Sequence, residues 1–128
     1  MRILICDDDT LIIEQLQKYI ESYFESNHLK CPELVSFTSG ESLLADKNEK
    51  DIVFLDIEMP GMNGLELLRR LRQEPRWQQL SVVMLTAHEA GPVSQQALDM
   101  GAQAYLTKPY SPQQLLAQVK RYAAAVVD

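Results

Sequence analysis

The sequence has few of the residues on which structural metal sites and disulfide frameworks depend. Its 128 residues include two cysteines and two histidines, and these are not clustered at metal-ligand spacing. Cys6 falls in an apolar run and Cys31 in a polar connection, so we expect free thiols in a reducing cytoplasm. Any bound metal should therefore be a hard ion held by oxygen atoms.

Long apolar runs and an excess of basic residues are also missing. No apolar segment approaches the ~18 residues of a membrane span, and the start does not read as a signal peptide. The formal net charge of −6 argues against direct binding to nucleic acid or to an anionic membrane. Without repeats, linkers or low-complexity segments, residues 1–128 are expected to form one cytoplasmic domain with no output domain.

Five short apolar runs alternate with five amphipathic segments. The runs predict strands at residues 2–6, 34–37, 52–55, 82–85 and 104–106. Helices are expected at residues 10–26, after Ser39, after Gly64, from Gly91 to Gly101 and from Ser111 onward. Such alternation predicts an α/β fold, a flavodoxin-like doubly wound parallel sheet with strand order 2-1-3-4-5.

Local signals specify several details of the predicted helices. Thr10 is the expected N-cap of the first helix, and Ser111, Pro112 and Gln114 form a capping box for the last. In the third helix, Leu65, Leu68 and Leu71 should face inward and Arg69, Arg70 and Arg72 outward as a solvated face. Trp77, on a loop after Pro75, is interpreted as a packing residue.

Polar side chains stand at the carboxyl ends of four of the predicted strands. Asp56 alone would more often be a turn or helix-capping residue, and Thr86 or Lys108 alone could be an ordinary strand-end or surface residue. The predicted strand order, however, gathers a larger set into one pocket: Asp7, Asp8, Asp56, Thr86 and Lys108.

This combination of side chains indicates phosphoryl chemistry. Three neighbouring carboxylates repel one another, and a small hard cation such as Mg²⁺ would neutralise them. A lysine ammonium and a threonine hydroxyl are suitable partners for a phosphoryl group. We therefore interpret the pocket as a site where an aspartate accepts a phosphoryl group with the help of a metal.

Over essentially its whole length, the chain resembles the CheY-like receiver domains of two-component response regulators. The resemblance rests on four motifs in order: Ile-Leu-Ile-Cys-Asp-Asp-Asp, Leu-Asp-Ile-Glu-Met-Pro-Gly-Met-Asn-Gly, Met-Leu-Thr-Ala and Ala-Tyr-Leu-Thr-Lys-Pro. It implies that Asp56 accepts phosphate from a sensor histidine kinase or phosphotransfer protein. It also implies that Asp8, Asp56 and the backbone carbonyl of Glu58 ligate Mg²⁺, while Asp7 acts through a bound water.

The same resemblance implies a switch. Thr86 would move toward the phosphoryl group and Lys108 would pair with it, while Tyr105 would turn inward. The Lys108–Pro109 bond would be cis. The face formed by the fourth helix, fifth strand and fifth helix would then signal to an unknown partner or output domain, or support a homodimer. Glu58 and His88 occupy the positions that tune phosphoryl lifetime in the family. No enzymatic activity is expected beyond the domain's own phosphorylation and dephosphorylation.

Two other functions are compatible with parts of the sequence. A phosphatase of the haloacid dehalogenase type also uses a strand-end aspartate, but its general acid is a second aspartate two residues later, where this chain has Glu58. A receiver-shaped binding module that is never phosphorylated usually lacks one of the site residues, whereas all are present here.

The two halves of the chain differ in composition. Residues 1–64 contain seven Ile and one Ala, and residues 65–128 contain no Ile and nine Ala. The formal charge changes from −8 (five basic, thirteen acidic) to +2 (seven basic, five acidic). The first half resembles receivers that precede LytTR-type DNA-binding domains, and the second resembles proteobacterial receivers. We hypothesise a chimera of two receivers, recombined or engineered, joined in or near residues 59–64.

Overall fold

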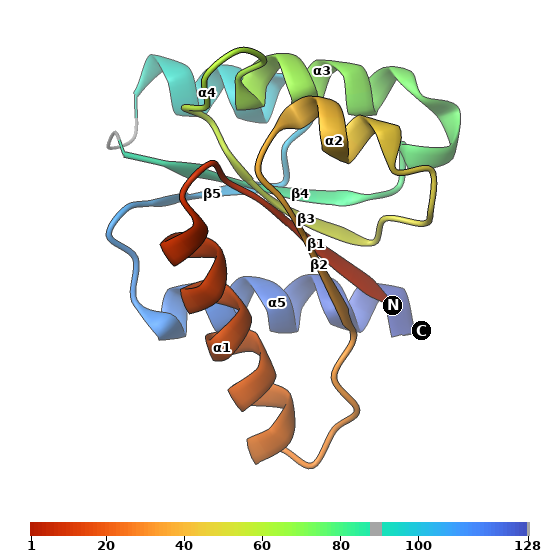
Figure 1. The fold of residues 1–128 in the computed structure, drawn as a ribbon, viewed down its shortest axis with the longest axis vertical. Helices are drawn as coiled ribbons and strands as arrows, with labels where there is room; N and C mark the ends of the chain where they lie inside the picture. Colours follow the sequence, from red (N-terminus) through yellow and green to blue (C-terminus); the bar gives the residue numbers. More distant parts are fainter. Residues whose placement is uncertain (88–90, 128) are drawn as a thin grey trace.

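Five parallel strands form one sheet in the order β2-β1-β3-β4-β5 (Figure 1). The computed structural model describes the backbone of residues 1–87 and 91–127, and the side chains of these residues up to Ala123. The strands are β1 (Arg2–Cys6), β2 (Glu33–Phe37), β3 (Ile52–Asp56), β4 (Ser81–Thr86) and β5 (Ala104–Thr107). Each predicted strand is present, and four extend one residue further at one end or both because ladder hydrogen bonds continue beyond the apolar run. The predicted flavodoxin-like fold is confirmed.

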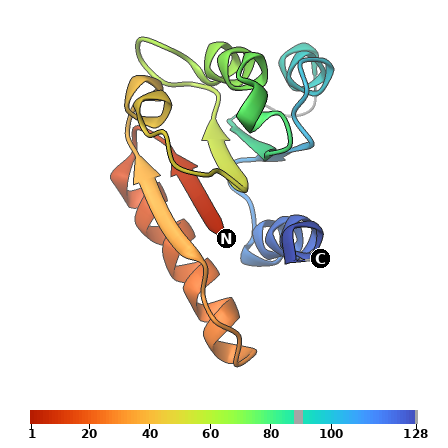
Figure 2. The same ribbon diagram turned by 90° about the vertical axis from the view of Figure 1, so that its right-hand side faces the viewer.

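Helices cover both faces of the sheet. They are α1 (Thr10–Ser26), α2 (Gly40–Ala45), α3 (Gly64–Gln73), α4 (Pro92–Asp99) and α5 (Pro112–Val127), with a short 3-10 helix at Pro75–Trp77. Figure 2 shows α1 and α5 on one side of the sheet and α2, α3 and α4 on the other. Two apolar cores result, because strand side chains alternate between the faces. β1, β3 and β4 are buried on both faces, as their continuous apolar runs predict.

The caps of the helices follow the sequence with one exception. Ser111 Oγ accepts from the backbone N–H of Gln114, and Gln114 Oε1 accepts from the N–H of Ser111, which confirms the capping box. The predicted N-cap at Thr10 is wrong. Asp9 caps α1, since its carboxylate accepts from the N–H of Leu11 at 3.0 Å and Thr10 is already helical. Aspartate ranks above threonine as an N-cap, so the third aspartate of the acidic run was the better choice.

The prediction for α3 is wrong in two respects. Leu67, not Leu65, is fully buried together with Leu68 and Leu71, and Leu65 is only partly buried. Arg72 does not belong to the solvated face. Its guanidinium donates to the carbonyl oxygens of Gly101 and Leu80 at 2.7 and 2.8 Å. The third helix therefore turns one arginine toward the body of the protein, while Arg69 and Arg70 remain exposed.

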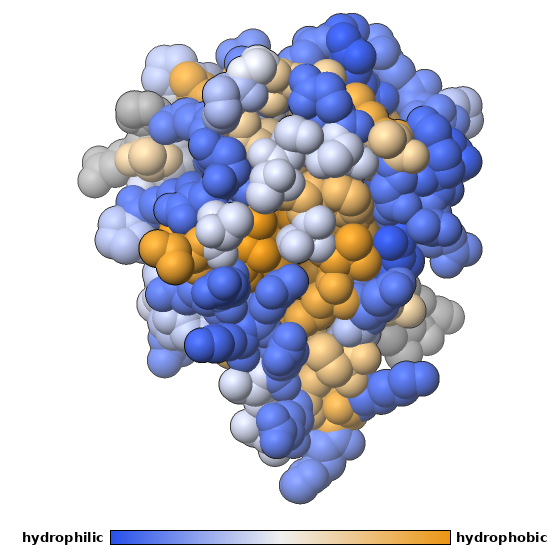
Figure 3. Space-filling model, viewed as in Figure 1, coloured by the Kyte–Doolittle hydropathy of each residue, from blue (hydrophilic) through white to orange (hydrophobic). Residues whose placement is uncertain are grey.

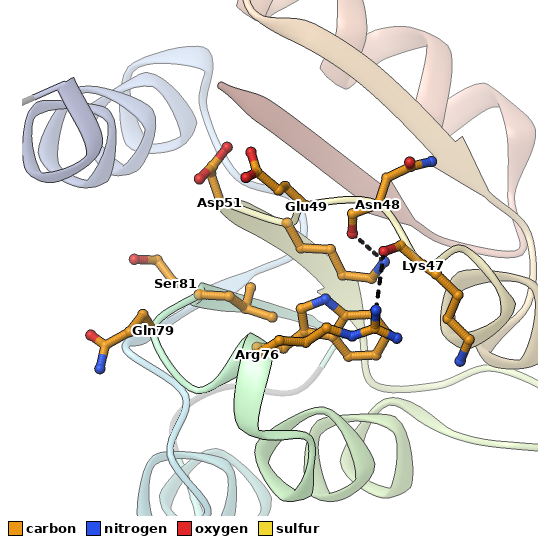
Figure 4. Close-up of a pocket in the computed structure, with 10 residues that line it drawn as sticks. Lys47, Asn48, Glu49, Asp51, Arg76, Gln79 and Ser81 are labelled. Atoms are coloured by element: carbon orange, nitrogen blue, oxygen red, sulfur yellow. Dashed lines mark hydrogen bonds between the residues drawn. The ribbon is translucent and has the colours of Figure 1, made fainter.

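Trp77 packs as predicted, with 3 % of its surface exposed, although it lies in a 3-10 helix. Lys50 approaches its ring, with the ammonium 4.2 Å from the ring centroid. That ammonium also donates to the carbonyl oxygens of Asp46 and Asn48, at 2.5 and 3.4 Å. The adjoining cavity has a volume of about 550 Å³. Figure 4 shows Arg76 on one side of it and Glu49 and Asp51 on the other. The cluster fixes the connections before β3 and β4, at the end of the sheet opposite Asp56.

Candidate functional site

The predicted site residues meet at the carboxyl ends of the strands. Asp7 and Asp8 follow β1, and Asp56 ends β3. Cys6 of β1 pairs with Leu55 of β3, so Asp7 and Asp56 each come one residue after this pair. Thr86 ends β4, and Lys108 comes directly after β5. The switch in strand order places β1 and β3 side by side, which brings the two groups of aspartates together.

The three aspartates form a candidate metal site. Each offers a carboxylate oxygen, and these oxygens all lie within 4.8 Å of one another. Asp7 and Asp56 are buried, with 1 % and 3 % of their surface exposed, whereas Asp8 is open to solvent. An all-oxygen donor set with one solvent-facing carboxylate fits a hard divalent cation that keeps part of its hydration shell.

Lys108 lies between the two buried carboxylates. Its Nζ atom is 3.1 Å from Asp7 Oδ2 and 3.3 Å from Asp56 Oδ1. Asp7 is held further by the backbone N–H of Asp9, which donates to Asp7 Oδ1 at 2.9 Å. The N–H of Glu58 donates to Asp56 Oδ1 at 3.3 Å. One ammonium therefore compensates part of the negative charge and also fixes the two carboxylates relative to each other.

The pKa of Asp56 reflects its burial beside a second carboxylate. Burial and, next, the negative charge of Asp7 raise the pKa of Asp56 to about 6, although Lys108 acts in the opposite direction. Burial alone would lower the pKa of Lys108, but its hydrogen bonds and charge interactions with Asp7 and Asp56 outweigh burial and raise it. A further cation beside Asp56 would favour its ionised form.

Thr86 and Tyr105 lie on neighbouring strands beside this pocket. Thr86 is fully buried and its carbonyl oxygen accepts from the backbone N–H of Lys108 at 2.7 Å. Tyr105 is partly buried and packs against the core beneath α3 and α4. The Lys108–Pro109 peptide bond is cis, the isomer that the resemblance implies. His88, the second expected lifetime position, lies outside the described residues.

The loop after Asp56 depends on Gly64. A Cβ atom on Gly64 would overlap the carbonyl oxygen of Asp56, and it would lie 2.7 Å from Ile57 Cα. The N–H of Gly64 donates to the carbonyl oxygen of Ile57 at 2.8 Å. The start of α3 is therefore pressed against the end of β3, which fixes the backbone around Asp56 and Glu58.

Two contributors to the site were not found from the sequence. Asp9 caps α1 and holds Asp7 through its own N–H; its position in an acidic run before a helical pattern was the available signal. Tyr110 follows the cis proline, and its hydroxyl is buried without a hydrogen-bond partner among the described atoms. Burial and then the charge of Asp7 raise the pKa of Tyr110, so its phenol stays neutral. No local sequence signal marks Tyr110 as a neighbour of the pocket.

Comparison with known proteins identifies related chains. The sequence model of the response regulator receiver domain matches residues 3–120. The phosphate regulon transcriptional regulatory protein PhoB of Pseudomonas aeruginosa is 33 % identical over 118 residues, covering 92 % of this chain and 49 % of PhoB. The chain therefore spans about half the length of such curated relatives.

Solved structures give the same result. A response regulator from Chloroflexus aurantiacus superposes with a TM-score of 0.85 at 33 % identity, covering 96 % of this chain and 97 % of that one. The BeF3-activated receiver domain of DrrB gives a TM-score of 0.83 at 27 % identity, with 96 % and 97 % coverage. Both halves of the chain lie within the family match, and the hypothesis of a chimera stays a prediction.

No helix among the described residues is long and apolar enough to cross a membrane.

Proposed function

The chain belongs to the response regulator receiver family, the phosphoacceptor module of two-component signalling, and we propose that Asp56 is the side chain that receives the phosphoryl group. The observation that carries this proposal is the contact of Lys108 with Asp56 at 3.3 Å, at the carboxyl end of a central strand. Lys108 supplies a fixed positive charge where a phosphoryl oxygen would arrive.

The reaction at Asp56 is a transfer from nitrogen to oxygen. A carboxylate oxygen of Asp56 attacks the phosphorus of a phosphohistidine on a sensor histidine kinase or phosphotransfer protein. The P–N bond breaks, its electron pair stays with the imidazole, and an acyl phosphate forms on Asp56. Lys108 then pairs with the phosphoryl oxygens. The chain has no other catalytic activity in this proposal than its own phosphorylation and dephosphorylation.

Mg²⁺ fits the oxygen donors of the pocket. Asp8, Asp56 and the backbone carbonyl of Glu58 would hold the ion, and Asp7 would act through a bound water. When bound, Mg²⁺ supplies the positive charge that three carboxylates and an incoming phosphoryl group require. The raised pKa of Asp56 supports this assignment, because a bound cation would offset both causes of the rise, the burial of Asp56 and the charge of Asp7.

Phosphorylation would be transmitted through Thr86 and Tyr105. The hydroxyl of Thr86 would bond the phosphoryl group, Tyr105 would turn inward, and the face made by α4, β5 and α5 would change its packing. That face would contact a downstream protein, an output domain or a second copy of the chain. Glu58 and His88 would set the lifetime of the phosphoryl group.

The net charge of the chain supports a proposal about its direct partners and its location. With a net charge of −6, this chain would contact neither nucleic acid nor a membrane directly, and it would act in the cytoplasm. PhoB and similar relatives are transcriptional regulatory proteins, and this chain covers about half of PhoB. Any contact with DNA would therefore come from another domain.

Intact-mass spectrometry after incubation with acetyl phosphate tests the proposal. We expect one Mg²⁺-dependent phosphoryl adduct on the wild-type chain and none on Asp56→Asn. An adduct that persists in Asp56→Asn would assign the phosphoacceptor elsewhere. No adduct on the wild type, with Mg²⁺ binding shown separately, would favour a binding module that is never phosphorylated.

A further inference from the structure

A groove of about 760 Å³ lies at the end of the sheet opposite Asp56. We call it the basal groove and define it by Tyr23, Phe24, Leu29, Lys30, Cys31 and Lys120. The first two residues belong to the last turns of α1, the next three to the connection before β2, and Lys120 to α5. Figure 2 shows the N-terminus, the beginning of β2 and α5 bordering this end of the molecule. The volume is within the range of sites that hold small organic ligands.

The apolar side of the basal groove is built by the end of α1. His28 has a positive φ of 54°, and the N–H of Leu29 donates to the carbonyl oxygen of Phe24 at 2.8 Å. This is a Schellman-type helix end, which brings the residue after the left-handed position against the last helical turn. Leu29 and Phe24 therefore line the same groove as a consequence of the backbone, not of a flexible loop.

Large apolar side chains are exposed at the groove. Among the described residues, four large apolar side chains are more than about a third exposed, and two of them line the groove: Leu29 at 53 % and Met1 at 37 %. Figure 3 shows an apolar strip that runs over β2 toward the loop after α1, bordered by polar side chains. Contiguous exposed apolar surface of this kind marks binding sites more often than isolated exposed side chains do.

The side chains that line the groove carry an excess of positive charge, since Arg2, Lys30 and Lys120 lie there with one carboxylate, Glu33. Arg2 also borders it, but its guanidinium pairs with Glu33 at 2.7 Å and with Asp46 at 3.2 Å. Lys30 and Lys120 form no ion pair or side-chain hydrogen bond within the described part of the chain. The two lysines leave the groove with an excess of positive charge in a chain whose net charge is −6.

We propose that the basal groove binds a small amphipathic carboxylate, such as a medium-chain fatty acid. The apolar chain lies against Phe24 and Leu29, and the carboxylate is bound between Lys30 and Lys120 by charge-assisted hydrogen bonds. This site is separate from Asp56, and its occupancy requires neither phosphorylation nor Mg²⁺.

Cys31 provides a direct readout of occupancy. It is exposed and lines the groove, whereas the other cysteine, Cys6, is fully buried. The rate of alkylation of Cys31 by a maleimide, followed by intact mass, should fall in a saturable manner as decanoate is added. Acetate should have no effect because it lacks the apolar chain. Decyltrimethylammonium should have little effect because its charge is reversed.

Variants separate the two parts of the proposed contact. The double variant Lys30→Gln/Lys120→Gln should weaken protection by decanoate about tenfold or more, the scale expected for losing a charge-assisted contact. Lys18→Gln removes an exposed lysine of α1 outside the groove and should leave protection unchanged. Leu29→Ser should weaken protection too, and its exposed position leaves the core intact.

Three results would overturn the proposal. They are the absence of protection by decanoate, equal protection by decyltrimethylammonium, and unchanged protection in the double lysine variant. Circular dichroism and phosphorylation of Asp56 by acetyl phosphate should be unchanged in every variant, which separates a failure of this proposal from a loss of fold or a failure of the phosphoacceptor assignment.

Discussion

Arg72 donates to the carbonyl oxygen of Gly101 at 2.7 Å and thereby joins the last turn of α3 to the turn between α4 and β5. The same guanidinium donates to the carbonyl oxygen of Leu80 at 2.8 Å and to Gln103 Oε1 at 3.0 Å. Gln103 Oε1 in turn accepts from the N–H of Val82 at 2.6 Å. One arginine thus satisfies backbone acceptors in the connections before both β4 and β5.

Replacing Arg72 by Ala should therefore destabilise the protein by about 2–3 kcal/mol, because several carbonyl groups lose their donor and packed methylene groups are removed. Arg72→Lys should lose an intermediate amount, since one ammonium cannot reproduce the planar fork. Urea denaturation measures the free energy of unfolding of both variants.

Arg69→Ala is the matched control on the same helix. Arg69 is exposed and, within the part of the chain that the structure describes, pairs only with Glu66, so its loss should leave the free energy of unfolding nearly unchanged. Equal effects of the Arg69 and Arg72 substitutions would show that the bonds of Arg72 to the two connections do not contribute to stability.

These arginines show where prediction from sequence stops. The strands could be predicted because a buried parallel strand is a continuous apolar run, a local property of residues such as Ile52–Leu55. Arg69, Arg70 and Arg72 are alike as residue types, and only contacts with residues up to 31 positions away distinguish Arg72. Helix periodicity predicts roughly which face of a helix a side chain lies on. Tertiary contacts decide whether a side chain near the edge of that face is buried or exposed.

The same distinction applies to the site. The meeting of Asp7, Asp56 and Lys108 follows from strand order, because every polar residue at a strand end reaches the same edge of the sheet. The burial of the Tyr110 hydroxyl and the left-handed conformation of His28 do not follow, since tertiary packing determines both. The side chains at the strand ends predicted phosphoryl transfer to an aspartate with a metal, and the resemblance of motifs assigned the phosphoacceptor and metal-ligand roles to individual residues.

Gly64→Ala should damage both the fold and the site. Its Cβ would overlap the carbonyl oxygen of Asp56, and neither α3 nor β3 can move without losing packing. We expect a loss of stability larger than about 2 kcal/mol and slower phosphorylation of the remaining folded protein. Thermal denaturation and acetyl phosphate labelling measure the two effects.

Gly61→Ala provides the comparison for this prediction. Gly61 has a φ of +76°, but the nearest atom to an added Cβ is Glu41 Oε1 at 3.9 Å. Only backbone strain of about 1–2 kcal/mol is expected there, with labelling of Asp56 preserved. A Gly64 variant no worse than the Gly61 variant would contradict the close packing of α3 on β3.

Tyr105→Ala should separate phosphorylation from signalling. Tyr105 lies on β5, outside the acidic pocket, and packs against the core below α4. We expect normal labelling of Asp56 by acetyl phosphate but smaller phosphorylation-dependent shifts of amide NMR signals in α4 and α5. Tyr105→Phe, which keeps the ring, should resemble the wild type more closely. An equal loss of labelling and of response would remove the switch role from Tyr105.

The raised pKa of Asp56 predicts how stability depends on pH without metal. An aspartate ordinarily titrates near 3.8, and in the folded chain the pKa of Asp56 is about 6. Between these values the folded protein holds a proton that the unfolded chain has lost. The contribution of Asp56 to the free energy of unfolding therefore falls as the pH rises from about 4 to about 6.

Asp56→Asn removes this titration and should be more stable than the wild type at pH 7 in EDTA by about 2–3 kcal/mol, with the difference vanishing toward pH 4. Urea denaturation at a series of pH values measures it, and Glu14→Gln, at an exposed carboxylate of α1, should follow the wild-type curve. Addition of Mg²⁺ should stabilise the wild type more than Asp56→Asn, because the ion binds the folded carboxylates. Parallel curves for wild type and Asp56→Asn would mean that Lys108 offsets both the burial of Asp56 and the charge of Asp7, and the pKa of Asp56 would then not be raised.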